Sequence, residues 1–509
     1  MRSKNAFRNL ILYFIYEILV FAMGIIFPRF IILTYGSEIN GLSSTITRIL
    51  SLINLIQAGA VGAAIFQMFK PVAENDYETQ SSIMYTSRKF YNKITIVYLV
   101  IATAVGIIFA FRLNNDNLSF VYVLLSFFIL AINGAAILFF NSICDIYISP
   151  HQKRYLLTIS SIANQVVNYS ILTIVLIFKL HFLFIFVAIL CGGITSAILN
   201  TIFYKKMSKG LINKNPANKN YKIPGKSYLM MSSVGSEAIT ASPTIIITTF
   251  IGLAYSSVFS IYALIYTSAK TILNSIQLSF SAIFGNLVKT SNNEKIRETH
   301  SCIELMTFIM GTVFSCGVGF LLIPFVKLYT KEVTDINYIY PLLAIFVSIY
   351  IVIFTFRTSF SYVATVYGLF KKTCYIVLFF GISGIVISIV SALIWGMPFV
   401  MIGLLYNQLG CSIATLFVLK KDVGWFKFKK LFIRLSLLIV LTAVSIILYF
   451  VFQPLISRWL IWALYGIICV SITFVILLIY CSIFERKEIK LLFGYFINFV
   501  RKKNKNEEI

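Results

Sequence analysis

The chain has 509 residues, of which 59% are apolar and only 12% are charged. Soluble domains usually contain about 45 to 50% apolar and about 25% charged residues, so this composition indicates a membrane protein with many spans. It leaves little chain for a large soluble catalytic domain, and it excludes intrinsic disorder, collagen-like arrays and disulfide scaffolds.

The formal net charge of +25 would suggest nucleic-acid binding in a soluble protein. Here the basic residues lie mostly in short polar segments between apolar runs, so we expect no nucleic-acid partner. The 8 cysteines are scattered singly without a CxxC pair, and the 3 histidines do not cluster. The sequence therefore predicts no metal site and no cofactor.

Taken in chain order, the apolar runs predict about fourteen transmembrane helices, each long enough for the roughly 20 residues that cross a bilayer. We expect them at 10–34, 43–69, 93–111, 120–143, 156–178, 183–204, 229–251, 256–286, 303–328, 339–366, 374–395, 399–419, 432–452 and 459–483. With the N-terminus in the cytoplasm, most Lys and Arg residues fall on the cytoplasmic side, including those from Lys420 to Arg434. The positive-inside rule therefore predicts that both termini are cytoplasmic.

The longest polar segment follows the sixth predicted span and suggests a division into two halves. We predict a six-helix bundle at 1–204, a basic cytoplasmic linker at 205–228 and a second six-helix bundle at 229–419. Two appended helices would lie at 420–483, followed by a basic cytoplasmic tail at 484–509. Six spans before the linker make the two bundles parallel repeats, and the expected fold class is an all-α polytopic membrane protein.

Ionisable residues inside spans are costly and are candidates for function. The six that we identify are Glu17, Arg29, Arg48, Glu237, Lys270 and Arg357. Lys270, Asn274 and Gln277 recur at helical spacing and share one helix face. We predict that substrate contacts come from Arg29, Arg48, Glu237, Lys270, Asn274, Gln277 and Arg357, and that Glu17 and Glu237 are candidates for ion coupling.

A second interpretation is that the polar rows join helices to one another, as small polar residues often do in membranes. For single Ser and Thr positions we favour this interpretation; for the basic residues we favour a functional one. Arg29 and Arg48 lie near the outer ends of their predicted spans, where their side chains could also reach the interface.

Buried cations beside only two deep acids, Glu17 and Glu237, favour an anionic substrate, because the Arg fork suits phosphate oxygens. A pump for cationic drugs should instead carry mainly acidic residues inside its spans. The sequence has no Walker A motif and no nucleophile elbow, so we predict transport rather than an enzyme. A membrane glycosyltransferase or polymerase is the alternative from another class, but the predicted outer loops are short and carry few carboxylates.

Several short motifs resemble the polysaccharide biosynthesis flippases of the Wzx type, in the multidrug/oligosaccharidyl-lipid/polysaccharide (MOP) exporter superfamily. They are Phe27-Pro28-Arg29, then Tyr35 to Leu42 in the first outer loop, Ala58-Gly59, and Phe69-Lys70-Pro71. The similarity is clearest over about the first 95 residues. The resemblance implies a V-shaped pair of six-helix bundles around a central cavity that alternates between inward-open and outward-open states.

The resemblance also implies a substrate: an undecaprenyl-diphosphate-linked oligosaccharide, moved from the cytoplasmic to the outer leaflet of the bacterial cytoplasmic membrane for surface polysaccharide assembly. Helices 1, 2, 7 and 8 line the cavity in such proteins, and these helices carry Arg29, Arg48, Glu237 and Lys270 here. Further expected partners are the lipid bilayer and polysaccharide polymerase and assembly proteins. A lipid II flippase and a cation-coupled drug antiporter of the same superfamily remain alternatives.

Overall fold

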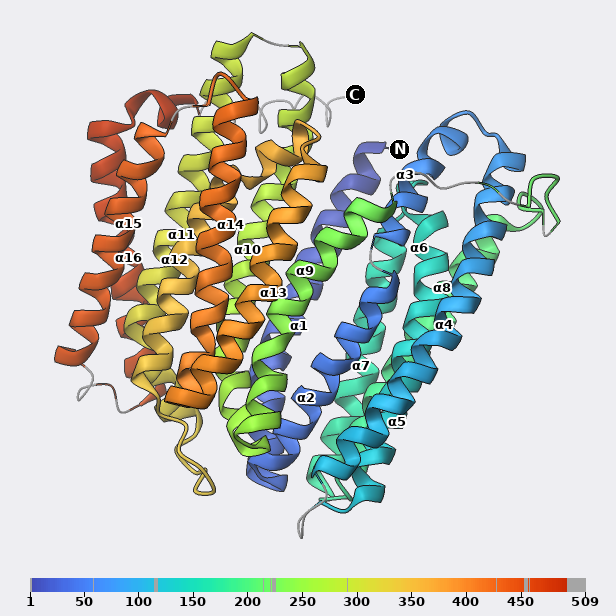
Figure 1. Cartoon of the computed structure of the whole chain (residues 1–509), viewed down its shortest axis with the longest axis horizontal. Helices are drawn as coiled ribbons and strands as arrows, with labels where there is room; N and C mark the ends of the chain where they lie inside the picture. Colours follow the sequence, from blue (N-terminus) through green and yellow to red (C-terminus); the bar gives the residue numbers. More distant parts are fainter. Residues whose placement is uncertain are drawn as a thin grey trace. The chain divides into compact units, whose positions relative to one another are not determined.

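The computed structural model describes residues 2–57, 59–113, 118–213, 215–219, 221, 226–290, 292–426, 428–452, 456 and 458–491. Across these residues all of the regular secondary structure is helical (Figure 1). The all-α fold class predicted from the sequence is confirmed. Ala58, parts of the predicted linker and the predicted tail beyond Leu491 lie outside the described residues.

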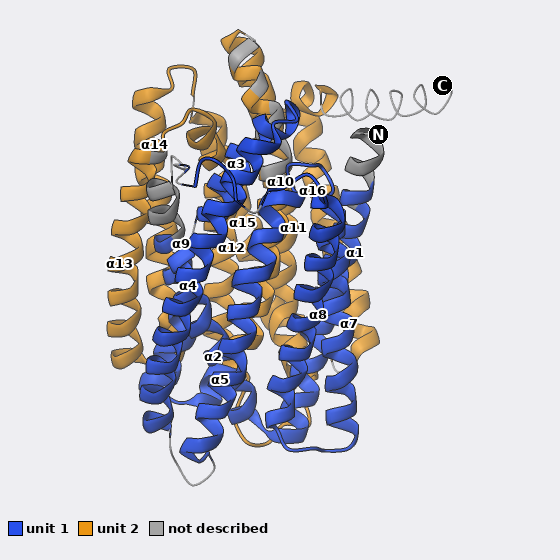
Figure 2. Ribbon diagram, turned by 90° about the vertical axis from the view of Figure 1, so that its right-hand side faces the viewer, with its two compact units in different colours: residues 1–257 blue, residues 258–509 orange. Residues whose placement is uncertain are grey.

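The chain forms two compact units, Met1–Ser257 and Val258–Ile509 (Figure 2). The helices of unit 1 are α1 (Arg2–Tyr35), α2 (Ser37–Ile53), η1 (Asn54–Gln57), α3 (Ala60–Ala73), α4 (Tyr77–Leu113), α5 (Phe120–Ala136), η2 (Ile137–Asn141), α6 (Ser142–Ile148), α7 (Tyr155–Ile177), α8 (Leu183–Ser208) and α9 (Lys226–Phe250). Helix α10 (Leu253–Thr290) begins in unit 1 and continues into unit 2. Unit 2 also contains α11 (Asn293–Tyr329), α12 (Pro341–Val366), α13 (Phe370–Trp395), η3 (Met397–Val400), α14 (Met401–Asp422), α15 (Lys429–Phe452) and α16 (Trp459–Phe484).

Within the described part of the chain, 12 helices are long and apolar enough to cross a membrane. The other two predicted spans, 229–251 and 256–286, fall on α9 and α10, helices of 25 and 38 residues. Those two helices carry the polar rows identified in the sequence. The structure thus has the helices of a multi-pass membrane protein.

The second predicted span is not one continuous helix. The predicted span was 43–69. In the structure α2 begins at Ser37, and the helix is interrupted at Gly59 before α3 begins. Gly36 and Gly59 have positive φ angles of 84° and 75°, a backbone conformation that glycine adopts without steric cost. The expected first outer loop from Tyr35 to Leu42 is therefore wrong: Gly36 alone separates α1 from α2.

Two helices extend well beyond the apolar runs that predicted them. Both α4 and α11 have 37 residues, about 55 Å at 1.5 Å per residue, whereas the hydrocarbon core is about 30 Å thick. Apolar content locates the part of a helix inside the bilayer, but polar residues continue the same helix outside it. The helical segments 77–92 and 293–302 were accordingly assigned to loops by the sequence pattern.

In unit 1, α8 packs against α7 and α5, while α1 packs against α7 and α9 packs against α2. The interior contains fully buried aromatic residues such as Tyr98, Phe127 and Phe186. Helix α9 belongs to unit 1, which ends at Ser257. The predicted linker lies earlier in the chain, around the segment that connects Ser208 at the end of α8 to Lys226 at the start of α9. The division into two parallel six-helix repeats stays a prediction.

In unit 2, α11 lies against α12, α15 and α16, and α14 packs against α12 and α13. The last two helices expose large apolar side chains, including Leu460, Ile467 and Phe484. Such surfaces are suited to lipid, since apolar side chains exposed to water on this scale would be unfavourable. Some polar side chains of unit 2 lie instead between helices, as do Ser315 of α11 and Thr442 of α15, whose hydroxyl oxygens are 2.9 Å apart.

Candidate substrate-binding site

Two helices of unit 2, α10 and α12, run side by side in the same direction. The rings of Tyr266 and Tyr350 have centroids 5.0 Å apart, and Gln277 Nε2 donates to Ser361 Oγ over 3.1 Å. These contacts are 11 residues apart on both helices, which is three helical turns, so one face of α10 follows one face of α12.

Lys270 and Arg357 lie on these facing surfaces, between the two contacts. Lys270 is four residues beyond Tyr266, and Arg357 is seven residues beyond Tyr350. With a rise of 1.5 Å per residue, they lie about 6 Å and about 10 Å beyond the tyrosine pair along the helix axis. Both side chains are half-buried. The α10–α12 face therefore brings two cations of the sequence prediction into one region.

Arg357 is held by a neutral partner on a third helix. Its Nη1 donates to Gln408 Oε1 of α14 over 2.8 Å, and Gln408 Nε2 donates to Tyr350 Oη over 3.3 Å. Gln408 is buried. An amide orients a guanidinium without neutralising it, so these bonds fix the Arg357 head group and leave its positive charge for an anion.

Asn274 and Gln277 complete this region, which we call the α10–α12 polar face: Lys270, Asn274, Gln277, Arg357 and Ser361, supported by Gln408 and Tyr350. Asn274 and Gln277 are half-buried. The face offers two cations, two amides and a hydroxyl. It could hold an anion together with hydroxyl-rich groups, because each amide both donates and accepts hydrogen bonds.

The remaining predicted site residues belong to unit 1. Glu17 and Arg29 on α1 and Arg48 on α2 are half-buried, and Glu237 on α9 is exposed. Of the predicted set, four members lie in unit 2 on the neighbouring helices α10 and α12. The assignment of all seven residues to substrate binding, and of Glu17 and Glu237 to ion coupling, stays a prediction.

Several Ser and Thr positions of unit 1 serve helix packing. Thr45 Oγ1 of α2 lies 2.6 Å from Thr248 Oγ1 of α9 and 3.3 Å from Ser256 Oγ of α10, and all three residues are buried. Asn40 Nδ2 donates to Ser257 Oγ over 2.7 Å. Thr248, one of the polar residues of α9, therefore agrees with the packing interpretation, since interhelical hydrogen bonds of this kind join helices in lipid.

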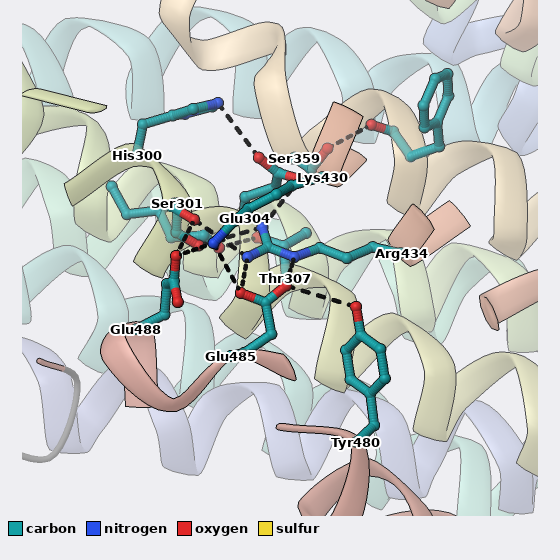
Figure 3. A network of polar contacts seen from close by, with 12 residues as sticks. His300, Ser301, Glu304, Thr307, Ser359, Lys430, Arg434, Tyr480, Glu485 and Glu488 are labelled. Atoms are coloured by element: carbon teal, nitrogen blue, oxygen red, sulfur yellow. Dashed lines mark hydrogen bonds and ion pairs between the residues drawn. The ribbon is translucent and has the colours of Figure 1, made fainter. Parts of the chain in front are cut away.

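A buried ionic network in unit 2 was missed by the sequence analysis (Figure 3). Arg434 of α15 binds Glu485 through two hydrogen bonds, Nε to Oε1 at 3.1 Å and Nη2 to Oε2 at 3.0 Å. Its Nη1 lies 2.9 Å from Glu304 Oε1 of α11. Lys430 Nζ lies 3.3 Å from Glu485 Oε2 and also pairs with Glu488. The network joins α11, α15 and the segment after α16.

The expectation of only two deep acids is wrong. Glu304 is 4% exposed and Arg434 is 2% exposed, although the sequence analysis counted Arg434 with a cytoplasmic loop. Two signals could have identified them: Glu304 lies inside the predicted span 303–328, and Arg434 lies inside 432–452. The spacing of His300 and Glu304, four residues apart on one helix face, is a further sequence signal for a buried pair. In the structure His300 Nε2 lies 3.5 Å from Glu304 Oε2.

The network has the properties of a structural clamp. Every charged group in it has an opposite charge or a hydrogen-bond donor as partner; Ser301, for example, donates its hydroxyl to Glu488 and accepts from Arg434. A buried charge is tolerated when it is paired in this way. The described residues contain no group of three or more His, Cys, Asp and Glu side chains that could hold a metal ion.

The fold is similar to the folds of solved membrane transporters and flippases. One similar solved structure is described as an inward-facing conformation of a multidrug resistance MATE family transporter of the MOP superfamily, with a TM-score of 0.66 and 11% identity. That match covers 80% of this chain and 99% of the other.

A second similar structure is the lipid II flippase MurJ in an inward closed conformation. Its TM-score is 0.68 at 14% identity, and the match covers 93% of this chain and 99% of the other. A MATE structure in complex with MaD3S is a third, with a TM-score of 0.57, 12% identity, and coverage of 83% of this chain and 97% of the other. These neighbours are transporters or flippases, and identities this low establish similarity of fold.

No protein-family model matches the chain, and no curated protein matches it in sequence.

Proposed function

We propose that the chain is a flippase for an undecaprenyl-diphosphate-linked oligosaccharide, which it moves from the cytoplasmic to the outer leaflet for capsule, exopolysaccharide or O-antigen assembly. The observation that carries the proposal is the α10–α12 polar face. Lys270 and Arg357 lie there within about one helical turn of each other along the axis, and Arg357 is oriented by the neutral amide of Gln408. Two such cations complement a diphosphate.

The chemistry of the face suits both parts of this substrate. Arg binds phosphate oxygens in a bidentate fork and Lys acts as a point charge, so together they bind an anion with two phosphates. Asn274, Gln277 and Ser361 offer the donors and acceptors that sugar hydroxyls need. The saccharide cannot cross hydrocarbon, and a polar face between helices supplies the required environment.

The membrane potential favours the proposed direction. Moving a negative charge out of a negative interior gains about 2.3 kcal/mol per charge per 100 mV. Transport of a diphosphate could therefore proceed without ATP hydrolysis. For coupling to a proton or sodium ion, the exposed carboxylate of Glu237 is more accessible than the half-buried Glu17.

The placement in the cell and the mode of transport follow from the same proposal. We infer a multi-pass protein of the bacterial cytoplasmic membrane with both termini in the cytoplasm, which works by alternating access. The lipid-linked substrate and the surrounding bilayer are its partners, and polysaccharide polymerase and assembly proteins would act on the exported unit.

Lipid II flipping is the second candidate. The match to the lipid II flippase covers 93% of this chain, against 80% for the first MATE structure, so it includes a larger part of this chain. Lipid II also carries a diphosphate, and the α10–α12 polar face suits it equally. Export of cationic drugs is less well supported, since Lys270 and Arg357 would repel such a substrate.

The test is depletion of the protein in its native host, followed by extraction of lipid-linked saccharides. The expected result is accumulation, on the cytoplasmic face, of an undecaprenyl-diphosphate oligosaccharide larger than lipid II, with loss of surface polysaccharide and normal peptidoglycan. Accumulation of lipid II with cell lysis would support the second candidate instead. If neither lipid accumulated, both would be rejected.

A further inference from the structure

Unit 1 contains an open cavity of about 650 Å³ that is lined by the N-terminal part of α4 and the C-terminal end of α8. Ligand sites typically have volumes of roughly 300 to 1,000 Å³. The wall between these helices is formed by η2 and α6, which contribute Phe139, Phe140 and Cys144. Since η2 is a π-helical turn within a longer helix, and such turns are frequent at functional sites, the cavity is a candidate binding site.

The charged groups that line this cavity are all basic. They are Arg88 of α4, Lys205 of α8 and Lys209, which follows α8 directly. The Arg88 guanidinium lies over the ring of Tyr204, 5.2 Å from its centroid, in a cation–π contact. Arg88 is half-buried and held on one side, whereas both lysines are exposed at the rim.

The first part of the predicted linker closes one side of the cavity. Gly210, Ile212 and Asn213 are lining residues, and the backbone N–H of Asn213 donates to Ser81 Oγ of α4 over 2.8 Å. Further on, the N–H of Ala217 donates to Glu78 Oε1 over 2.7 Å. The segment is thus tied to α4 at two points, and the three basic residues surround a defined space.

The nearby carboxylates do not line the cavity. Glu78 accepts the hydrogen bond from Ala217, and Asp145 of α6 accepts one from Ser149 Oγ. The lining therefore combines three positive charges with aromatic and hydroxyl groups. Basic pockets between transmembrane helices on the cytoplasmic side are typical binding sites for anionic head groups.

We propose that this cavity binds a phosphate-bearing anion, with the Arg88 fork and the ammonium groups of Lys205 and Lys209 on the phosphate oxygens. Phe139 and Phe140 would contact the apolar part of the ligand. Either the head group of an anionic phospholipid or a soluble phosphate ester would supply this chemistry. The site belongs to unit 1 and is independent of the α10–α12 polar face, so it stands even if the proposed substrate is wrong.

The experiment measures binding to the full chain in a nonionic detergent by native mass spectrometry and microscale thermophoresis. The probes are dioctanoyl phosphatidylglycerol, dioctanoyl phosphatidylcholine as the zwitterionic control, and glycerol 3-phosphate as the soluble phosphate ester. The variants are Arg88→Gln and Lys205→Gln. Lys89→Gln and Lys206→Gln are matched controls, because each removes one exposed positive charge from the adjacent position outside the lining.

We expect Arg88→Gln to weaken binding of phosphatidylglycerol about tenfold or more, since a charge-assisted hydrogen bond is lost. Lys205→Gln should weaken it less, Arg88→Lys should retain part of the affinity, and the two matched controls should bind as the wild type. Glycerol 3-phosphate binding as tightly as phosphatidylglycerol would assign the site to a soluble phosphate ester; much weaker binding would assign it to a lipid. Equal binding of phosphatidylcholine, or equal losses in Arg88→Gln and Lys89→Gln, would overturn the proposal.

Discussion

Arg434 and Glu485 form a two-bond ion pair inside unit 2, with the guanidinium fork of α15 facing the carboxylate that directly follows α16. Both side chains are almost completely buried, at 2% and 3% exposure. Glu304 of α11 binds the same guanidinium from another side. The last two spans are thereby fastened to α11 at one end of the unit.

The first prediction is that Arg434→Gln strongly destabilises the protein. Removal of one partner leaves Glu304 and Glu485 buried without their cation, and such losses cost about 3 to 5 kcal/mol. The melting temperature of the purified full chain should fall clearly. Lys429→Gln is the control, since Lys429 is an exposed cation on the same helix. Equal melting temperatures for both variants would show that the ion pair contributes nothing to stability.

The second prediction concerns acid sensitivity at the edge of this network. Burial raises the pKa of the Glu488 carboxyl, but hydrogen bonds from Lys430 and the backbone outweigh burial and hold that pKa below its usual value of 4.5. A carboxyl whose pKa is lower in the folded state stabilises the protein above its unfolded pKa. This stability is lost as the pH falls below about 4.5, through the folded pKa.

Lys430→Gln should therefore weaken the dependence of the melting temperature on pH below about 4.5, because the cation that lowers the Glu488 pKa is gone. Melting curves between pH 3 and pH 7 test this on the full chain. The wild type should lose more stability than the variant on acidification. An unchanged pH profile in Lys430→Gln would assign the acid response to other carboxylates.

Much of the fold was predictable because membrane spans are determined by apolar length. The all-helical class and the positions of most spans follow from hydropathy alone. Helix ends do not, since polar residues continue α4 and α11 beyond the bilayer thickness. The break at Gly59 was also missed, because a single positive φ angle leaves no trace in an apolar pattern.

The candidate site was predictable only in part. Helical spacing placed Lys270, Asn274 and Gln277 on one face, but it could not show that α10 follows α12 or that Gln408 orients Arg357. Those are contacts between residues 84 and 51 positions apart. Arg434 and Glu304 were missed for a related reason: near the end of a span, sequence does not tell a charge buried by tertiary contacts from one in water.

The third prediction tests close packing in unit 1. An added Cβ on Gly41 of α2 would lie 2.0 Å from the carbonyl oxygen of Leu253, which is backbone and cannot move aside cheaply. Gly41→Ala should therefore separate α2 from the start of α10 and lower the melting temperature. Gly62→Ala on α3 is the control, since no heavy atom lies within 4 Å of its added Cβ. Similar melting temperatures would contradict this packing.

The fourth prediction is topological and rests on the charge pattern of the sequence. Reporters fused after Lys503 and inserted within 213–222 should both report the cytoplasm, and a reporter within 114–117 should report the exterior. An exterior signal from the C-terminal fusion would mean that one span is miscounted, and it would reverse the orientation of α15 or α16.

The last prediction concerns the two cations of the α10–α12 polar face. If Lys270 contacts the diphosphate, Lys270→Ala should slow flipping about tenfold to a hundredfold, since a charge-assisted contact contributes roughly 1.5 to 3 kcal/mol. Lys270→Arg should keep part of the flipping rate. Lys270→Glu should flip more slowly than Lys270→Ala, because the carboxylate repels the phosphates in a site where charges are weakly screened.

Gln408→Leu tests the same face without removing a charge. It deletes the amide that orients the Arg357 guanidinium, so flipping of the lipid-linked substrate should slow while the charge is kept. Proteoliposomes with fluorescent undecaprenyl-diphosphate saccharides give flipping rates, and Lys331→Ala in a predicted outer loop is the control at equal protein level. Wild-type rates in both Lys270→Ala and Lys270→Glu would exclude Lys270 from diphosphate binding. A wild-type flipping rate in Gln408→Leu would show that Arg357 acts independently of its amide partner, and the oriented-cation argument for this face would then fail.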